Sequence, residues 1–269
     1  MFLLAVVAFV RLTGLEAGPL LTRLMALTPY VSVLAALVAA LLFARNRPAA
    51  LVALVACVTL AGVVVPRTFA ESAGEGEPLR VLTLNVAGRQ DPRVVVELVR
   101  RFRPHVFSAV GLPAGGTEGL RQAGIEQQLP YTVPGLYSTY RLRALDGVQG
   151  ARLEAPSGPI EVFSVRPGPK SGWHGVLPPP SPEAIRVLAG DFGASLDHRA
   201  FRQLLKSGYA DAAARVGKGL VPTWPSGRRV PPFVTVDHVV ADARVEVRQV
   251  EVVDVPGFEH RAVYAELAT

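Results

Sequence analysis

Residues 185–198 read IRVLAGDFGASLDH, a mostly apolar run that ends in a polar turn. The apolar run predicts a buried strand, and a helix is expected to begin at His198. Gly190 and Asp191 stand at the carboxyl end of that strand. Because α/β proteins place ligand-binding groups at such strand ends, Asp191 is a candidate site residue. The alternative is that Asp191 only caps a turn.

On both sides of this stretch, residues 79–269 contain many short apolar runs and only a few segments with helical spacing of apolar residues. A proline-rich loop is expected over 167–182. The expected strands are 80–86, 105–110, 135–142, 148–153, 160–165, 185–189, 235–240, 245–253 and 262–267, and the expected helices are 91–102, 117–123 and 198–206. Many short strands with few helices predict an α/β fold in which two sheets pack together and helices lie outside.

Three further motifs place polar side chains at expected strand ends. They are LTLNV at 82–86, VDHV at 236–239 and PGFEHRAV at 256–263. The first contains Asn85, the second Asp237, and the third Glu259 and His260. Taken singly, Asn85 is a common turn residue and His260 a surface histidine. Since all four follow or end strands, where folds of this kind place function, we expect them to converge with Asp191.

The order and spacing of these motifs resemble the endonuclease/exonuclease/phosphatase family, with the deoxyribonuclease I-like fold, over residues 79–269. The resemblance is strongest to bacterial members with membrane helices in front. It implies a four-layer α/β/β/α sandwich and a phosphoesterase that hydrolyses a phosphodiester or phosphomonoester. It also implies Mg²⁺ or Mn²⁺, which binds carboxylate and amide oxygens and neutralises charge on phosphate.

The resemblance assigns roles to individual residues. Asp191 matches the group that handles the attacking water, and Asp237 matches the carboxylate that orients the catalytic His260. Asn85 and Glu259 match metal-binding positions. In the loop VPTWP at 221–225, two residues match the substrate side, namely Thr223 and Trp224. A place in the core is the alternative for Trp224.

Three positions depart from the family pattern. Gly111 stands where a metal-binding Glu is usual, Gly193 where Asn is usual, and Arg166 where His is usual. We expect weak Mg²⁺ binding, which Gly111→Glu should strengthen. Arg166 is a substrate-binding candidate because its guanidinium binds phosphate bidentately. Glu118 is a candidate replacement ligand. The two functions that remain open are a weakened phosphoesterase and a catalytically inactive member that binds an anionic ligand or a protein partner.

The front of the chain has the composition of a membrane segment. Half of the 269 residues are hydrophobic, and only 19% are charged. Helices need about 20 apolar residues to cross a bilayer, so two or three transmembrane helices are expected. The expected organisation is a helical segment over 1–70 with spans near 1–15, 24–44 and 48–66, a linker over 71–78 and a globular domain over 79–269. The alternatives are a buried hairpin of a soluble protein and, for the first run, a signal-peptide core.

Charge predicts the orientation and the partners. Arg45 and Arg47 lie between the two longer apolar runs, and such residues stay cytoplasmic. A multi-pass protein of the cell membrane with an extracytoplasmic C-terminal domain is therefore expected, although Arg11 and Arg23 would then also lie outside. Residues 71–269 carry nearly balanced charge, which does not support a nucleic-acid partner. The expected partners are the lipid bilayer and a phosphorylated substrate or ligand.

Overall fold

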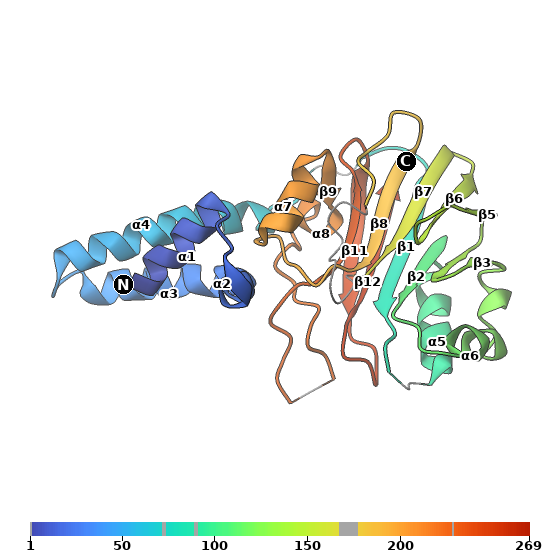
Figure 1. The fold of residues 1–269 in the computed structure, drawn as a ribbon, viewed down its shortest axis with the longest axis horizontal. Coiled ribbons are helices and arrows are strands. Elements are labelled where there is room, and N and C mark those ends of the chain that lie inside the picture. Colours follow the sequence, from blue (N-terminus) through green and yellow to red (C-terminus); the bar gives the residue numbers. More distant parts are fainter. Residues whose placement is uncertain (1, 72–73, 89–90, 167–176, 228) are drawn as a thin grey trace.

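The structure is a computed structural model that describes residues 2–71, 74–88, 91–166, 177–227 and 229–269. Two six-stranded mixed sheets form an α/β sandwich, and a group of helices precedes it (Figure 1). The two-sheet α/β fold expected from the sequence is therefore confirmed. Residues 167–176 of the expected proline-rich loop lie outside the described residues.

The first sheet has the strand order β11-β12-β1-β2-β4-β3. Its strands are β1 (Pro78–Asn85), β2 (Val106–Val110), β3 (Tyr131–Val133), β4 (Leu136–Ser138), β11 (Glu246–Val253) and β12 (Ala262–Ala268). β1 and β2 are parallel with Asn85 opposite Val110, whereas the other pairs are antiparallel. Asn85 and Gly111, which follows β2, therefore lie at the same edge of this sheet.

The second sheet has the strand order β5-β6-β7-β8-β10-β9. Its strands are β5 (Leu142–Ala144), β6 (Gly150–Ala155), β7 (Gly158–Val165), β8 (Ile185–Asp191), β9 (Tyr209–Asp211) and β10 (Asp237–Asp242). β7 and β8 are parallel with Val165 opposite Gly190, and Asp191 is paired with Asp237 across β8 and β10. This register brings Arg166, Asp191 and Asp237 to one edge.

Three apolar clusters hold the layers together. Val81, Val187 and Val263 belong to the cluster between the two sheets. Helices cover the outer faces: α5 (Pro92–Phe102) and α6 (Gly116–Gln122) lie on the first sheet, and α7 (Arg199–Lys206) lies on the second. Fully burying one such apolar side chain stabilises the fold by about 1.5–3 kcal/mol. The layer order is α/β/β/α.

The strand expected over 135–142 is divided in the structure. β4 ends at Ser138, and β5 begins at Leu142 on the other sheet. The Ser138 hydroxyl donates to the His105 carbonyl at 2.7 Å and accepts from the Tyr140 amide at 3.0 Å, which turns the chain. The sequence also missed β3 and β9, because strands of three residues are too short to show an alternating pattern.

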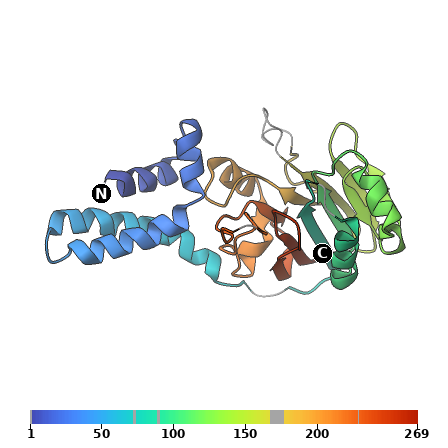
Figure 2. The same ribbon diagram turned by 90° about the horizontal axis from the view of Figure 1, so that it is seen from below.

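The preceding helices extend from one side of the sandwich (Figures 1 and 2). They are α1 (Phe2–Thr13), α2 (Gly18–Met25), α3 (Thr28–Leu42), α4 (Arg47–Val64) and the 3₁₀ helix η1 (Val65–Thr68). In the described chain, one helix is long and apolar enough to cross a membrane, over Arg47–Thr68, and α1 and α2 pass the same test only as a pair bent by 87°. The span expected near 24–44 is shorter than predicted, because α2 ends at Met25 and α3 begins at Thr28, with Pro29 in its first turn.

Small residues pack these helices together while their outer faces stay apolar. Ala35 and Ala39 of α3 belong to one cluster with Ala53 and Ala56 of α4. Small residues let helix backbones approach closely, as in membrane bundles. All but two of the exposed large hydrophobic residues of the described chain lie within 2–69. An apolar surface of this extent indicates a membrane or a partner.

Asp197, in the loop between β8 and α7, joins the helices to the sandwich. Its carboxylate pairs with Arg11 of α1 at 2.6 Å and with Arg67 of η1 at 2.6 and 2.8 Å. The Asp197 side chain is only 1% exposed, so two guanidinium groups compensate one buried carboxylate. A second link runs from the Tyr30 hydroxyl on α3 to the Phe233 carbonyl at 2.9 Å.

Candidate functional site

The candidate site lies where the carboxyl ends of β1 and β8 meet across the sandwich. Asn85 Nδ2 donates to Asp191 Oδ2 at 2.9 Å, and this hydrogen bond links the first sheet to the second. Asn85 Oδ1 accepts from the Ala87 amide at 3.1 Å, and Asp191 Oδ1 accepts from the Gly193 amide at 2.8 Å. Asn85 is buried and Asp191 is half-buried. Both side chains are thus held in one orientation at the edge of the core.

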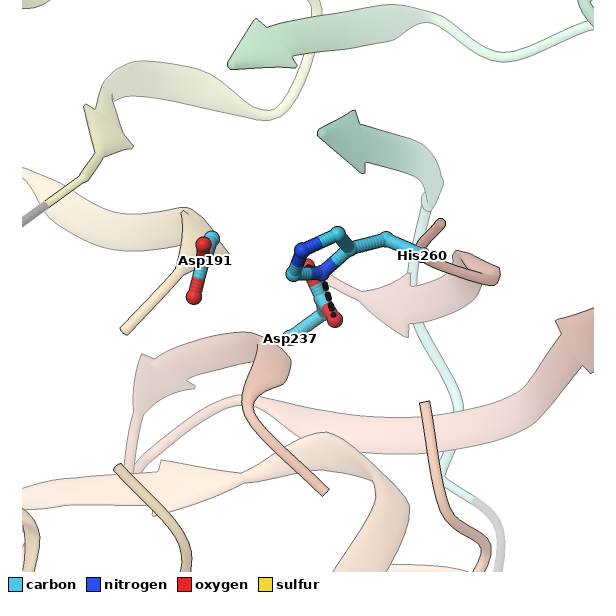
Figure 3. Close-up of side chains that lie close together, drawn as sticks. All are labelled: Asp191, Asp237 and His260. Atoms are coloured by element: carbon cyan, nitrogen blue, oxygen red, sulfur yellow. Dashed lines mark hydrogen bonds and ion pairs between the residues drawn. The ribbon is translucent and has the colours of Figure 1, made fainter. Parts of the chain in front are cut away.

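Asp237 and His260 form a second pair beside the first (Figure 3). His260 Nδ1 lies 2.9 Å from one Asp237 carboxylate oxygen and 3.1 Å from the other. Since a carboxylate accepts this bond, the imidazole carries a proton on Nδ1. The other nitrogen, Nε2, lies 3.4 Å from Asn85 Nδ2. The structure therefore brings together Asn85, Asp191, Asp237 and His260, four of the five residues expected to converge.

The pKa values of His260 and Asp237 both lie above the ordinary values of these side chains. Burial alone lowers the pKa of His260, but the hydrogen bond and charge of Asp237, with the charges of Asp191 and Glu259, raise that pKa above its ordinary value. Burial also raises the pKa of Asp237 against the opposing influence of His260. A protonated imidazole stabilised in this way can donate from Nε2 toward the site.

The loop that carries His260 is fixed by neighbours that the sequence did not single out. Arg261 pairs with Asp254 at 2.8 Å, and the Ser226 hydroxyl donates to the same carboxylate at 2.9 Å. The Ser226 amide also donates to the Glu259 carbonyl at 2.6 Å. The sequence offered one signal for this arrangement: Arg261 directly follows the candidate His260, and Asp254 lies seven residues before Arg261.

Two residues expected on the substrate side have different surroundings. Thr223 is 0% exposed, and its hydroxyl accepts from the Val236 and Asp237 amides at 3.0 Å each. Thr223 therefore holds the backbone that carries Asp237 and does not face a ligand. Trp224 is half-buried, with its ring centroid 6.1 Å from that of Phe233.

The acidic groups of the site include a candidate metal cluster. Asp191, Asp237 and His260 each offer one ligand atom, and these atoms lie within 4.8 Å of one another. Glu259, the other expected metal ligand, is exposed and is not a member of this cluster. Any ion here would share its ligands with existing hydrogen bonds, because both Asp237 oxygens already accept from His260.

A protein-family model described as Endonuclease/Exonuclease/phosphatase family matches residues 82–259. The match begins in β1, includes three of the four converging residues and ends directly before His260. The chain belongs to the endonuclease/exonuclease/phosphatase family. Enzymes of this family typically depend on divalent metals, which agrees with the acidic cluster. The comparison with curated proteins finds no match.

Solved structures share the fold of this family member at low sequence identity. An endonuclease/exonuclease/phosphatase from Beutenbergia cavernae is 16% identical, with a TM-score of 0.50 and coverage of 71% of this chain and 72% of the other. D. rerio TDP2, complexed with a single-strand DNA product, is 13% identical, with a TM-score of 0.51 and coverage of 72% and 100%. A family protein from Leptotrichia buccalis is 10% identical, with a TM-score of 0.50 and coverage of 71% and 100%. These likenesses show the fold.

The position expected to hold the family's main metal carboxylate is filled differently here. Gly111 has φ +74°, a conformation that residues with a side chain rarely adopt. A Cβ there would lie 2.9 Å from Arg166 Nη1 and 2.9 Å from Asn85 Oδ1. Position 111 therefore supplies no ligand for a divalent ion: no carboxylate projects from it, and a guanidinium lies against it.

No observation tests the expectation that Gly111→Glu alone would strengthen metal binding, but the geometry favours another outcome. The new side chain would begin 2.9 Å from Arg166 Nη1, so its carboxylate would pair with that guanidinium. Glu118, the candidate replacement ligand, is bound to its own helix. Its oxygens accept from Arg121 at 2.6 and 2.7 Å and from Gln122 at 2.8 Å, so it is held on its own helix. Those contacts lower the pKa of Glu118 to about 2.

Proposed function

We propose that this chain is a membrane-anchored phosphoesterase that acts on a phosphodiester or phosphomonoester outside the cytoplasm. The observation that carries the proposal is the meeting of Asn85, Asp191, Asp237 and His260 at one edge of the sandwich. These side chains come from distant parts of the chain. Their types suit phosphate chemistry, because they combine an amide, an acid–base pair and a carboxylate that can orient water.

The residues divide the work of hydrolysis. Asp191 holds the attacking water and accepts its proton as the new P–O bond forms, while Asn85 Nδ2 stands beside it as a hydrogen-bond donor. Asp237 orients His260, whose protonated Nε2 donates to a phosphate oxygen or to the departing oxygen. The raised pKa of His260 keeps this proton available near neutral pH.

A divalent ion remains part of the proposal, with Mg²⁺ or Mn²⁺ as the expected metals. The carboxylates of Asp191 and Asp237 would hold it, while His260 keeps its protons for Asp237 and for the substrate. When bound, it would supply charge neutralisation at the phosphate oxygens. Weak binding is expected, because position 111 provides no carboxylate and the cluster's oxygens already accept hydrogen bonds.

The membrane anchor is proposed from the helices α1–α4. Their exposed apolar faces and the span over Arg47–Thr68 suit a bilayer. With Arg45 and Arg47 in the cytoplasm, the sandwich lies outside. Arg11 no longer argues against this orientation, because its charge is paired with Asp197 of the sandwich itself.

A second candidate function is ligand binding without turnover. Three departures from the family pattern favour it. The expected catalytic set loses a carboxylate at Gly111, an amide side chain at Gly193 and a titratable imidazole at Arg166. The parts of a catalytic unit act together, so the first loss does most of the damage. Such a degenerate member would still bind an anionic ligand or a protein partner.

Hydrolysis by the detergent-solubilised full chain separates these candidates. Bis-p-nitrophenyl phosphate and p-nitrophenyl phosphate would be assayed with Mg²⁺, with Mn²⁺ and with EDTA. We expect slow release of p-nitrophenol that Asp191→Ala and His260→Ala abolish. Glu118→Gln, a change at an exposed carboxylate held on α6, serves as the matched control and should leave the rate unchanged. Equal rates in the native chain and Asp191→Ala would contradict the phosphoesterase.

A further inference from the structure

Arg166 differs from the ion-paired arginines of the second sheet. On the same sheet, Arg152 and Arg186 each pair with Glu161 at 2.8 Å. Arg166 is exposed, and none of the carboxylates in the described ranges forms an ion pair with it. It follows β7 directly, one residue beyond the last pair of the parallel register, Val165 with Gly190. A charged group without a carboxylate partner thus stands at the edge of the candidate site.

The guanidinium reaches from the second sheet to the first. The point where a Gly111 side chain would begin lies 2.9 Å from Arg166 Nη1 and 3.2 Å from its Cζ. The same point is 2.9 Å from Asn85 Oδ1, so the guanidinium and the amide both border the space that a Gly111 side chain would enter. Gly111 is the residue that makes room for it. The missing side chain and the arginine therefore belong to one arrangement.

We propose that Arg166 binds the phosphate group itself, in place of a divalent ion, so that phosphate binding at this site needs no metal. This inference rests on the proposed function for the ligand class, a phosphate ester. A guanidinium carries a permanent charge and presents five N–H donors that match phosphate oxygens bidentately. The same charge repels a divalent cation, so Arg166 both replaces a metal beside Asn85 and weakens metal binding at Asp191.

The first test measures phosphate binding without metal. The full chain in detergent, with EDTA present, would be titrated calorimetrically with inorganic phosphate, phenyl phosphate and diphenyl phosphate, which separates free phosphate, monoester and diester as ligands. We expect saturable binding of at least one of them. Arg166→Gln should weaken it by about 10- to 100-fold, as for the loss of hydrogen bonds to a charged group. Arg166→Lys should restore part of the affinity.

Arg143→Gln is the matched control, because Arg143 is an exposed arginine on β5 of the same sheet. It should leave phosphate affinity unchanged. The second test is a Mn²⁺ titration of the native chain and Arg166→Gln. Removal of the guanidinium should tighten Mn²⁺ binding. Phosphate binding that appears only with Mn²⁺ present, or equal phosphate affinity in the native chain and Arg166→Gln, would overturn the inference.

The outcomes also separate this inference from the proposed function. Binding in EDTA through Arg166 without hydrolysis of either nitrophenyl ester supports the inference and contradicts the phosphoesterase. Hydrolysis that needs Mn²⁺, with phosphate affinity unaffected by Arg166→Gln, supports the phosphoesterase and contradicts the inference. Neither binding nor hydrolysis contradicts both.

Discussion

At Gly111, the absence of one side chain shapes the whole candidate site. The left-handed backbone strains any residue with a side chain here, and a Cβ would require the Arg166 guanidinium and the Asn85 amide to shift. Gly190 is a second such position, since a Cβ there would lie 2.0 Å from the Val165 carbonyl oxygen. At both places, glycine allows two strands to bring their polar ends together.

A residue-scale prediction follows for the pair Gly111 and Arg166. Gly111→Glu alone should lower stability by about 1–3 kcal/mol, the cost of a strained backbone, and should not tighten Mn²⁺ binding. Gly111→Glu combined with Arg166→His should bind Mn²⁺ more tightly than either single variant, because the carboxylate then has room and no guanidinium opposes it. Calorimetry with Mn²⁺ and thermal unfolding check both. Equally tight binding by the single Glu variant would show that Arg166 is not in the way.

At the scale of elements, one side chain joins β9, α8 (Ala212–Arg215) and β10. Asp211 Oδ1 accepts from the Ala214 amide at 2.7 Å and so caps α8. Its Oδ2 lies 2.7 Å from His238 Nδ1 on β10. His238 thus faces away from the candidate site, because successive side chains of a strand point to opposite faces of the sheet. A short edge strand with little apolar surface depends on such polar contacts.

Asp211→Ala should therefore destabilise the fold by about 2–4 kcal/mol. The loss combines a helix cap, worth about 1 kcal/mol, with a buried imidazole N–H left without its acceptor, worth about 1–3 kcal/mol. Urea unfolding followed by tryptophan fluorescence measures the change. Asp146→Ala, at an exposed turn, is the control and should have little effect. If Asp211→Ala lowered the free energy of unfolding as little as Asp146→Ala does, the proposed contribution of Asp211 to stability would be refuted.

At the scale of the whole molecule, the helices and the sandwich are joined through a buried carboxylate. Burial alone raises the pKa of Asp197, but the hydrogen bonds and charges of Arg67 and Arg11 outweigh it and hold the pKa below its ordinary value. Because the folded-state pKa is depressed, the stabilisation is present above pH 3.8, the ordinary value. It is lost as the pH falls through the folded-state pKa.

Asp197→Ala leaves two guanidinium groups without their shared carboxylate and should cost about 3–5 kcal/mol. Thermal unfolding of the full chain in detergent measures this cost at neutral pH. The difference between native and variant should shrink only in acid stronger than the ordinary pKa of a carboxyl group. Glu118→Ala breaks an exposed pair with Arg121 and should cost no more than about 1 kcal/mol. Similar melting temperatures for both variants would contradict the buried junction.

The proposed orientation gives a prediction of its own. A reporter that is active only outside the cytoplasm should be active when fused after Thr269. The same reporter fused after Asn46, in the turn between α3 and α4, should be silent, because the arginines of that turn keep it cytoplasmic. Activity of the Thr269 fusion only with a cytoplasmic reporter would reverse the orientation.

Local patterns in the chain were enough to predict the two-sheet fold, most strand positions and the convergence of Asn85, Asp191, Asp237 and His260. Alternation, strand-end polarity and motif order are properties of neighbouring residues, so they are readable along the chain. The burial of Thr223, the guanidinium against Gly111 and the junction at Asp197 became visible only in three dimensions. Each depends on contacts between residues far apart in the chain, and no local pattern encodes such contacts.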